Sequence, residues 1–343
     1  MRRSSAALLA ALILSPLALR AEMEIAPPVK ITWNGFLQHW ASVGETPKYE
    51  YAQSGTLLKR LRFKMGVEAY DGVNVVIVPE LAGAGFVLLD GYAQIDLSKY
   101  LLNFSPPLTV TAGQFKTPFG LNRMSTPPQL ALVDYSSVSN GVMGTTNFWD
   151  DGVMVSYKEG SLFKLDAAWV EGLGPDQANP GGNAFGTKQA QDFVGRLELG
   201  SLLPGLSLGG SIYEGQGFTS PGTVAYPVGG KDNPKIISGA FLRYALPGKS
   251  FSLDTEFLDR TLEKGGYTVQ VAQYLVDSVQ LVMAYDSVTD YQNDKADATR
   301  YMGGVNWFPG GPVRLSLNQV GSASGPSQAP TNTRSILQTQ ITW

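Results

Sequence analysis

Apolar and polar side chains alternate along most of this chain with a period of two residues. The clearest segment runs from Lys59 to Tyr70. Its odd positions are apolar: Leu61, Phe63, Met65, Val67 and Ala69. Its even positions are mostly charged or polar: Arg60, Arg62, Lys64, Glu68 and Tyr70. Successive side chains of a β-strand point to opposite faces, so this pattern predicts a strand with one face in an apolar medium and the other in water.

The same alternation recurs along the chain and predicts about sixteen strands. The expected segments are 31–41, 58–70, 73–78, 88–97, 108–116, 150–158, 162–172, 192–199, 204–214, 236–246, 251–259, 267–275, 278–287, 300–307, 312–320 and 335–343. The gaps after odd-numbered segments are mostly long, at 42–57, 117–149, 173–191, 215–235, 288–299 and 321–334. The gaps after even-numbered segments are mostly short turns rich in Gly, Pro and Asp.

Long and short connections in alternation place the long loops at one end of an antiparallel sheet. Outer-membrane barrels have long extracellular loops and short periplasmic turns, whereas a two-layer sandwich does not require this segregation. The pattern therefore favours an all-β fold, a closed antiparallel transmembrane β-barrel of about 16 strands. An even strand number leaves both termini in the periplasm.

The two ends of the chain agree with a bacterial outer-membrane location. Arg2 and Arg3 precede an apolar run from Ala6 to Leu14, the order found in secretory signal peptides. The run is too short for a membrane-spanning helix, which needs about 20 residues, so we expect a signal peptide at 1–21 and a single barrel at 22–343. The last strand, which ends on Trp343, resembles the C-terminal strand that the barrel-assembly machinery recognises in such proteins.

Composition adds further limits. The chain has no cysteine and a net charge of -3, which gives no support for a nucleic-acid partner. Aromatic residues make up 10% and fall near predicted strand ends, where they suit the lipid headgroup level. These girdle candidates include Trp33, Trp40, Trp169, Tyr301 and Trp307.

Sixteen strands enclose a water-filled lumen rather than a packed core. The inward positions are polar, so the geometry predicts passive diffusion of small hydrophilic solutes without a cofactor. We expect no enzymatic activity. His39 is the sole histidine, and it is expected at the girdle or in the lumen. The Asp150-Asp151 pair is better explained as the boundary between a loop and a strand than as a metal site.

Three stretches carry a resemblance to a known family. The sequence from Gly113 to Gly120, Gly-Gln-Phe-Lys-Thr-Pro-Phe-Gly, continues into Leu121, Asn122 and Arg123. With the basic strand Lys59–Gly66 and the final strand, it resembles the phosphate-selective porin O and P family. The resemblance implies a homotrimer of sixteen-stranded channels, some of which select phosphate through lumenal arginines. It also implies that the loop at 117–149, the third of the loops that follow odd-numbered segments, folds into the lumen as a constriction. Lys116 and Arg123 would lie close to it.

The candidate anion-binding residues of the pore are thus Arg60, Arg62, Lys64, Lys116 and Arg123. Cations that line a pore with low-dielectric walls enrich anions, and arginine binds oxyanions through a two-pronged fork. Alternatively, these cations pair with lumenal carboxylates, for which the candidates are Glu68, Asp90, Asp96, Asp166, Asp254 and Glu256. The inward charges are mixed in sign and no long ladder of arginines is evident, so we expect a mild preference for inorganic anions, with phosphate among the candidates.

Two other functions remain open at this stage. The chain could form a plugged structural or adhesive barrel in the outer membrane, with long loops that bind a surface partner. It could also be a secreted all-β binding protein, for instance for carbohydrate.

Overall fold

The computed structural model describes residues 22–26, 29–44, 54–82, 86–101, 107–143, 149–171, 192–201, 203–215, 235–246, 248, 250–261, 263–291, 297–324 and 332–343. The expected signal peptide at 1–21 lies outside these ranges. Among the described residues, no helix has the length and apolar character needed to cross a membrane.

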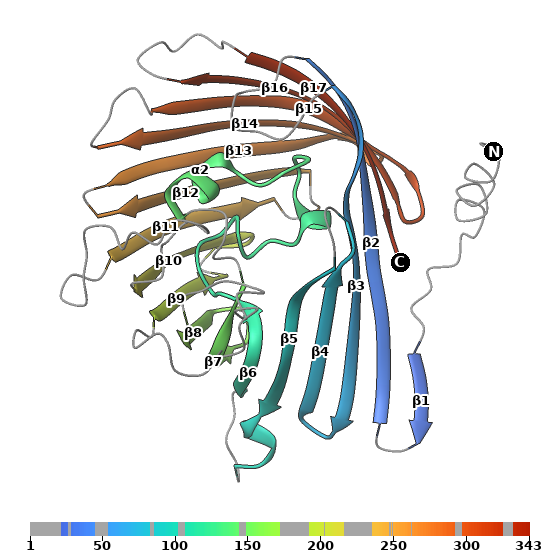
Figure 1. Cartoon of the computed structure of the whole chain (residues 1–343), viewed down its shortest axis with the longest axis vertical. Helices are drawn as coiled ribbons and strands as arrows, with labels where there is room; N and C mark the ends of the chain where they lie inside the picture. Colours follow the sequence, from blue (N-terminus) through green and yellow to red (C-terminus); the bar gives the residue numbers. More distant parts are fainter. Residues whose placement is uncertain are drawn as a thin grey trace.

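One antiparallel sheet accounts for almost all of the described structure, and it curves around an interior (Figure 1). The strands are β1 (Glu22–Ala26), β2 (Val29–Gly44), β3 (Gly55–Tyr70), β4 (Val73–Glu80), β5 (Val87–Asp96), β6 (Leu108–Lys116), β7 (Trp149–Glu159), β8 (Phe163–Val170), β9 (Asp192–Gly200), β10 (Leu206–Gly215), β11 (Lys235–Ala245), β12 (Phe251–Arg260), β13 (Lys264–Val276), β14 (Val279–Asp290), β15 (Ala298–Gly310), β16 (Val313–Ser324) and β17 (Asn332–Thr342).

Strands β2 to β17 form a closed sixteen-stranded barrel. Each strand pairs with the next one in sequence, and β17 returns to pair with β2 from Phe36 to Gly44. This pairing leaves no open edge, so the sheet needs no second layer to protect it. A dry two-layer sandwich, the fold expected of a secreted binding protein, is therefore not what this chain forms.

Every one of the sixteen predicted segments corresponds to a strand between β2 and β17, which confirms the predicted fold. The additional strand β1 was not predicted. It pairs with β2 at residues 29–32, next to the stretch of β2 that β17 occupies. The two strands thus share one edge of β2, which is 16 residues long.

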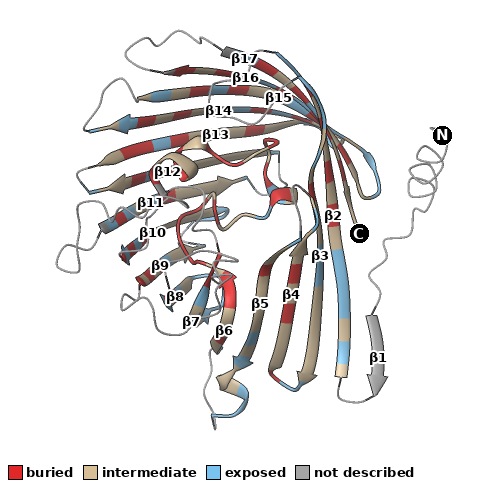
Figure 2. Cartoon of the chain, viewed as in Figure 1, coloured by how far each residue is buried: buried red, intermediate tan, exposed pale blue. Residues whose placement is uncertain are grey.

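Side chains divide between the two faces of the barrel as the alternation predicted. Large apolar side chains are exposed on the outer face, including Met283 at 64%, Leu317 at 55% and Trp169 at 54%. Inward positions of the same strands carry buried polar groups, among them Asp286, Ser316, Asn318 and Asp166. Buried and exposed positions alternate along many of the strands in Figure 2. An apolar outer face and a polar inner face are the arrangement that a membrane barrel requires.

Trp40 is an exception among the girdle candidates. It was expected at the lipid headgroup level, but it is only 2% exposed and faces the interior. Its indole Nε1 donates to Gln338 Oε1 at 2.7 Å, and the Lys59 ammonium lies 4.3 Å from its ring centroid. The prediction was wrong because Trp40 lies on the same file of β2 as the inward residues Gln38 and Ser42.

Candidate functional site

The segment that joins β6 to β7 lies inside the barrel (Figure 1). Its described part covers residues 117–143 and contains a short 3-10 helix, η2 (Pro127–Gln129), and an α-helix, α2 (Ser137–Met143). We call residues 117–143 the inner segment. Much of it is buried although it joins two strands, so its backbone needs hydrogen-bond partners on the barrel wall.

Apolar side chains hold the inner segment against two patches of the wall. Phe119, Val138 and Val142 are buried against wall residues that include Phe115, Tyr213 and Leu258. Leu132 and Val133 pack in a second cluster with Trp40, Val282 and Ile336. Burying such a side chain contributes roughly 1.5–3 kcal/mol, so these clusters fix the path of the segment across the interior.

Glu256 on β12 is the main acceptor for the start of the segment. Its carboxylate accepts hydrogen bonds from the backbone N–H groups of Leu121 at 2.7 Å and Asn122 at 3.3 Å. The hydroxyl of Ser139 lies 3.4 Å from the same carboxylate. Glu256 is 3% exposed, so these bonds are made away from bulk water. One wall residue therefore ties the beginning of the segment to α2.

Further along the segment, other wall side chains accept from its N–H groups. Asp286 on β14 accepts from the backbone N–H of Ser137 at 2.7 Å and from its hydroxyl at 2.8 Å. Asn318 on β16 accepts from the backbone N–H of Val133 at 3.1 Å. These acceptors meet donors that a buried loop would otherwise leave without partners.

Three inward arginines donate to backbone carbonyls of the segment. Arg196 reaches Gly120 at 2.9 Å, Arg300 reaches Tyr135 at 2.6 Å, and Arg314 reaches Leu130 at 2.7 Å. The prediction of individual strands did not identify these residues, because nothing in the sequence relates β9, β15 and β16 to a loop far away along the chain. Their guanidinium groups hold the segment in place.

The structure also explains two glycines of the family motif. Gly120 has a φ of +68°, a left-handed conformation that favours glycine, and a Cβ there would collide with the carboxylate of Glu256. Gly113 has a φ of +119°, and a Cβ would lie against the carbonyl of Gly91 on the neighbouring strand β5. The motif thus encodes a tight passage from β6 into the inner segment.

Three of the five predicted cations contact the segment, and two of them, Arg60 and Arg123, are buried. Arg60 is 6% exposed and donates to Gln38 at 2.8 Å and to Asp134 at 2.6 Å. The Lys116 ammonium donates to the carbonyl of Ser125 at 2.9 Å. Arg123 is 1% exposed and donates to the carbonyl of Ser139 at 3.2 Å. Burial lowers the pKa of Arg123 to about 9, so its guanidinium stays protonated at neutral pH.

Asp134 of the inner segment meets two cations of β3. Its carboxylate lies 2.6 Å from Arg60 Nη2 and 3.2 Å from Lys59 Nζ. Burial alone would raise the pKa of Asp134, but the charges of Arg60 and Lys59 outweigh it and hold the pKa well below its ordinary value of 3.8. The pairs therefore stabilise the folded protein above pH 4, and this contribution falls as the pH drops towards the lowered pKa.

Asp134→Asn should reduce the stability of the folded barrel at pH 7 by about 1.5–3 kcal/mol, the range for a hydrogen bond to a charged group. The difference between the variant and the wild type should stay constant above pH 5 and shrink steadily below pH 4. Urea unfolding in detergent, followed by gel mobility at several pH values, measures both quantities. A difference that grows on acidification would contradict the assignment of this ion pair.

Of the five candidate cations only Lys64 is exposed, and the Arg62 side chain is 13% exposed. Arg62 Nε donates to Glu80 Oε2 at 2.6 Å, while its guanidinium lies 5.3 Å from the ring centroid of Trp149. Lys64 is exposed, and it makes no ion pair with another residue in the described ranges. The carboxylates that pair with Arg60 and Arg62 are Asp134 and Glu80, which are not among the candidates that the sequence suggested.

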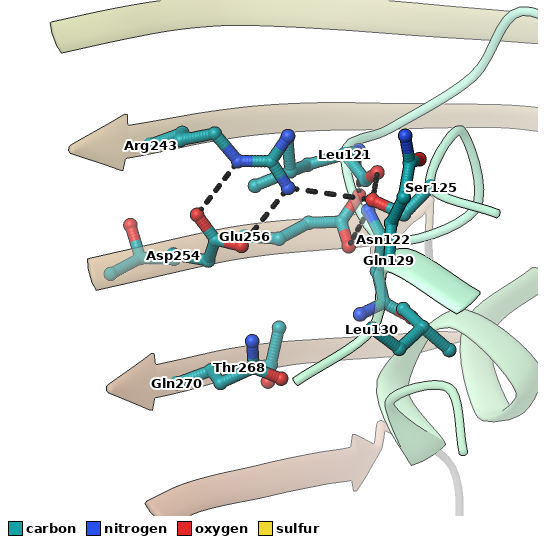
Figure 3. Close-up of a pocket in the computed structure, with 11 residues that line it drawn as sticks. Leu121, Asn122, Ser125, Gln129, Leu130, Arg243, Asp254, Glu256, Thr268 and Gln270 are labelled. Atoms are coloured by element: carbon teal, nitrogen blue, oxygen red, sulfur yellow. Dashed lines mark hydrogen bonds and ion pairs between the residues drawn. The ribbon is translucent and has the colours of Figure 1, made fainter. Parts of the chain in front are cut away.

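Arg243 on β11 and Asp254 on β12 form an ion pair that strand prediction did not single out as a site. Arg243 Nε and Nη2 lie 2.8 Å and 3.0 Å from the two carboxylate oxygens of Asp254 (Figure 3). Arg243 Nη2 also donates a hydrogen bond to Ser125 Oγ of the inner segment at 3.4 Å. The Arg243 side chain is 42% exposed, so this pair is accessible from the lumen.

The described residues contain no group of three or more His, Cys, Asp or Glu side chains that could hold a metal ion. His39 lies opposite Thr339 on the outward file of β2, between the buried inward residues Gln38 and Trp40. This placement agrees with the girdle position that was one of its two expected locations.

Solved structures of bacterial porins share the fold. OmpT of Vibrio cholerae in its trimer form is 12% identical with a TM-score of 0.59, and the match covers 92% of this chain and 99% of that one. An anion-selective porin from Comamonas acidovorans is 10% identical with a TM-score of 0.62, over 92% and 100% of the two chains. OmpF of Salmonella typhi in complex with daunomycin is 7% identical with a TM-score of 0.66, over 94% and 100%. No curated protein sequence matches the chain.

A closed sixteen-stranded barrel with an apolar exterior and a polar interior defines a porin of the bacterial outer membrane. The model of the family described as phosphate-selective porin O and P matches residues 37–203. This match confirms the resemblance that the motifs of the chain carried. Fold and family indicate a channel rather than an enzyme.

Proposed function

We propose that this porin passes small hydrophilic solutes by passive diffusion and has a mild preference for inorganic anions, phosphate among them. The anion preference is inferred from which cations of β3 have an ion-pair partner. Lys64 is exposed to the lumen and has no ion-pair partner in the described part of the chain, whereas neighbouring Arg62 is paired with Glu80. One exposed ammonium without an ion pair favours anions only weakly.

The preference is mild because most inward charges are compensated. Besides the pairs on β3, Lys164 pairs with Asp166 at 2.9 Å, and Arg196 pairs with Glu198 at 2.8 Å. Paired charges present little net field to a passing ion, so an extended cationic path is not expected. Arg60, Lys116 and Arg123 then contribute to selectivity mainly by positioning the inner segment and by adding positive potential from behind it.

The inner segment is proposed as the constriction, which the sequence placed at 117–149. Its contacts with β3 on one side and with β9 to β16 on the other support this role. In this role the segment narrows the free cross-section, and the exposed Lys64 faces the solute path. The aromatic ring of Trp149, next to Arg62, adds a rigid side to this path.

The remaining features of the proposal concern assembly. We infer a homotrimer, because the OmpT structure that resembles this chain is described as a trimer form. We also infer a cleaved signal peptide at 1–21, recognition of the Trp343 strand by the barrel-assembly machinery, and contact of the exposed outer face with outer-membrane lipid. The long loops would then lie on the extracellular side.

Lys64→Gln should shift the zero-current potential of the channel under a potassium chloride gradient towards cation preference. The expected change in the anion-to-cation permeability ratio is about two-fold, consistent with the removal of one partly screened lumenal charge. Arg62→Gln should shift the potential in the same direction, because it leaves the Glu80 carboxylate without its cation, and neutralising Glu80 as well should cancel this shift. If Lys64→Gln leaves the potential unchanged, the proposed anion preference of this site is wrong.

The same bilayer experiment separates the channel from a plugged structural or adhesive barrel. Purified protein should give stable stepwise increases in conductance, because a solute path remains beside the inner segment. Correct folding is checked by migration on a gel with and without boiling, since membrane barrels stay folded in detergent until heated. Correctly folded protein that gives no conductance steps would favour the plugged barrel.

A further inference from the structure

The niche beside the Arg243–Asp254 pair has a chemistry different from that of the β3 cations. It lies between the inner segment and strands β11 to β13, with a volume of about 20 Å³, space for one water-sized group (Figure 3). Its lining is rich in hydroxyl and amide groups. They belong to Asn122, Ser125, Gln129, Thr268 and Gln270.

Arg243 and Asp254 keep further hydrogen-bond donors and acceptors beyond those that join them to each other. A guanidinium has five N–H donors, and Arg243 uses Nε and Nη2 for Asp254 and Ser125. The two N–H groups on Nη1 make no hydrogen bond with another described residue. Each carboxylate oxygen of Asp254 accepts one bond from Arg243 and retains a further lone pair. The pair thus offers a donor and an acceptor side by side.

Amide donors surround the rest of the niche. The carbonyl oxygen of Asn122 accepts from the backbone N–H of Ser136 at 2.9 Å, and that of Gln129 accepts from Thr126 at 3.3 Å. With both oxygens engaged, the amide N–H₂ groups of these two side chains remain available to a ligand oxygen. Gln270 contributes a third amide from β13.

The mixed charges of the niche offer no ion a site of purely opposite sign. Asp254 and Glu256 both line it and repel an anion, while the guanidinium of Arg243 repels a cation. A neutral hydroxyl group meets neither penalty, because it can accept from Arg243 and donate to Asp254. Two hydroxyls on adjacent carbons would match the adjacent donor and acceptor of the ion pair.

We propose that Arg243, Asp254 and the amides around them form a binding site for neutral polyhydroxy solutes, namely sugars and sugar alcohols. One hydroxyl of the solute enters the niche, and the rest of the molecule stays in the lumen beside the exposed Arg243 side chain. The site goes beyond the proposed anion preference, which depends on Lys64 of another strand. It would bind a sugar weakly and briefly during passage, as a channel requires.

The test uses full-length mature porin in planar bilayers, with glucose added to a potassium chloride solution. Glucose should reduce the open-channel current in a saturable way and add current noise from binding and release. Arg243→Gln and Asp254→Asn should each weaken the apparent affinity by about ten-fold, the loss of one hydrogen bond to a charged group. Ser252→Ala changes an inward residue of β12, the strand that carries Asp254. It is the matched control and should leave the glucose titration unchanged.

Three outcomes would overturn the proposal. An equal reduction of the current by a short ethylene glycol oligomer of equal mass would indicate viscosity alone. Wild-type titration curves for both variants would place the site elsewhere. A saturable block by inorganic phosphate that depends on Arg243, with none by glucose, would identify an anion site. Lys64→Gln tests the anion preference separately, because it should move the zero-current potential and leave the glucose titration intact.

Discussion

Glu256→Ala is expected to raise the single-channel conductance of this porin by about two-fold or more, since conductance follows the free cross-section at the narrowest point. The carboxylate of Glu256 accepts from Leu121 and Asn122 at the start of the inner segment and lies near the Ser139 hydroxyl on α2. Each hydrogen bond to a charged group contributes about 1.5–3 kcal/mol. Their joint loss should release the start of the segment from the β12 wall.

Single-channel recordings in planar bilayers measure this effect directly. Ser252→Ala is again a suitable control, because it changes an inward residue of β12 that makes no hydrogen bond with the segment in the described structure. Glu256→Gln should have an intermediate effect, since an amide oxygen can still accept but carries no charge. If Glu256→Ala forms a correctly folded barrel with unchanged conductance, the segment does not narrow the channel.

The sequence was sufficient for the barrel because strand alternation is a local property. The outward file of β3 can be identified from Leu61, Phe63 and Met65 without any knowledge of their neighbours. Strand β1 was missed for the opposite reason. Its five residues, Glu22–Ala26, are too few to establish a pattern, and only their pairing with β2 defines them as a strand.

The interior could be predicted only in part, because its contacts join residues far apart in the sequence. Glu256 and Leu121 are separated by 135 positions, and Arg314 and Leu130 by 184. No periodicity encodes such pairings. The alternation placed Arg60, Arg62 and Lys64 on one file of β3, but it could not show that Arg60 pairs with Asp134 of the inner segment. It also ended the third predicted strand at 78, before Glu80, the partner of Arg62.

Gly35→Val should destabilise the folded barrel by about 3 kcal/mol or more, the upper part of the range for an overpacked site. Gly35 lies at the seam where β17 closes on β2, and its backbone exchanges two hydrogen bonds of 3.0 Å with Trp343. A Cβ at Gly35 would lie 2.5 Å from the carbonyl oxygen of Arg62 and 2.7 Å from Trp343 Cζ2. The centroid of the Trp343 ring lies 5.4 Å from that of the Phe63 ring. A side chain at residue 35 would force the Trp343 ring out of this position.

Gly303→Val is the matched control for the seam. Gly303 is a strand glycine of β15, and a Cβ there would meet nothing within 4 Å. A β-branched residue suits a strand, so this change should leave stability within about 0.5 kcal/mol of the wild type. Urea unfolding in detergent and the yield of heat-resistant protein compare the two variants. If Gly35→Val and Gly303→Val are equally stable, the Trp343 ring can pack at the seam without the space that Gly35 leaves free. A selective loss for Gly35→Val would show that barrel closure requires a glycine beneath the terminal aromatic ring.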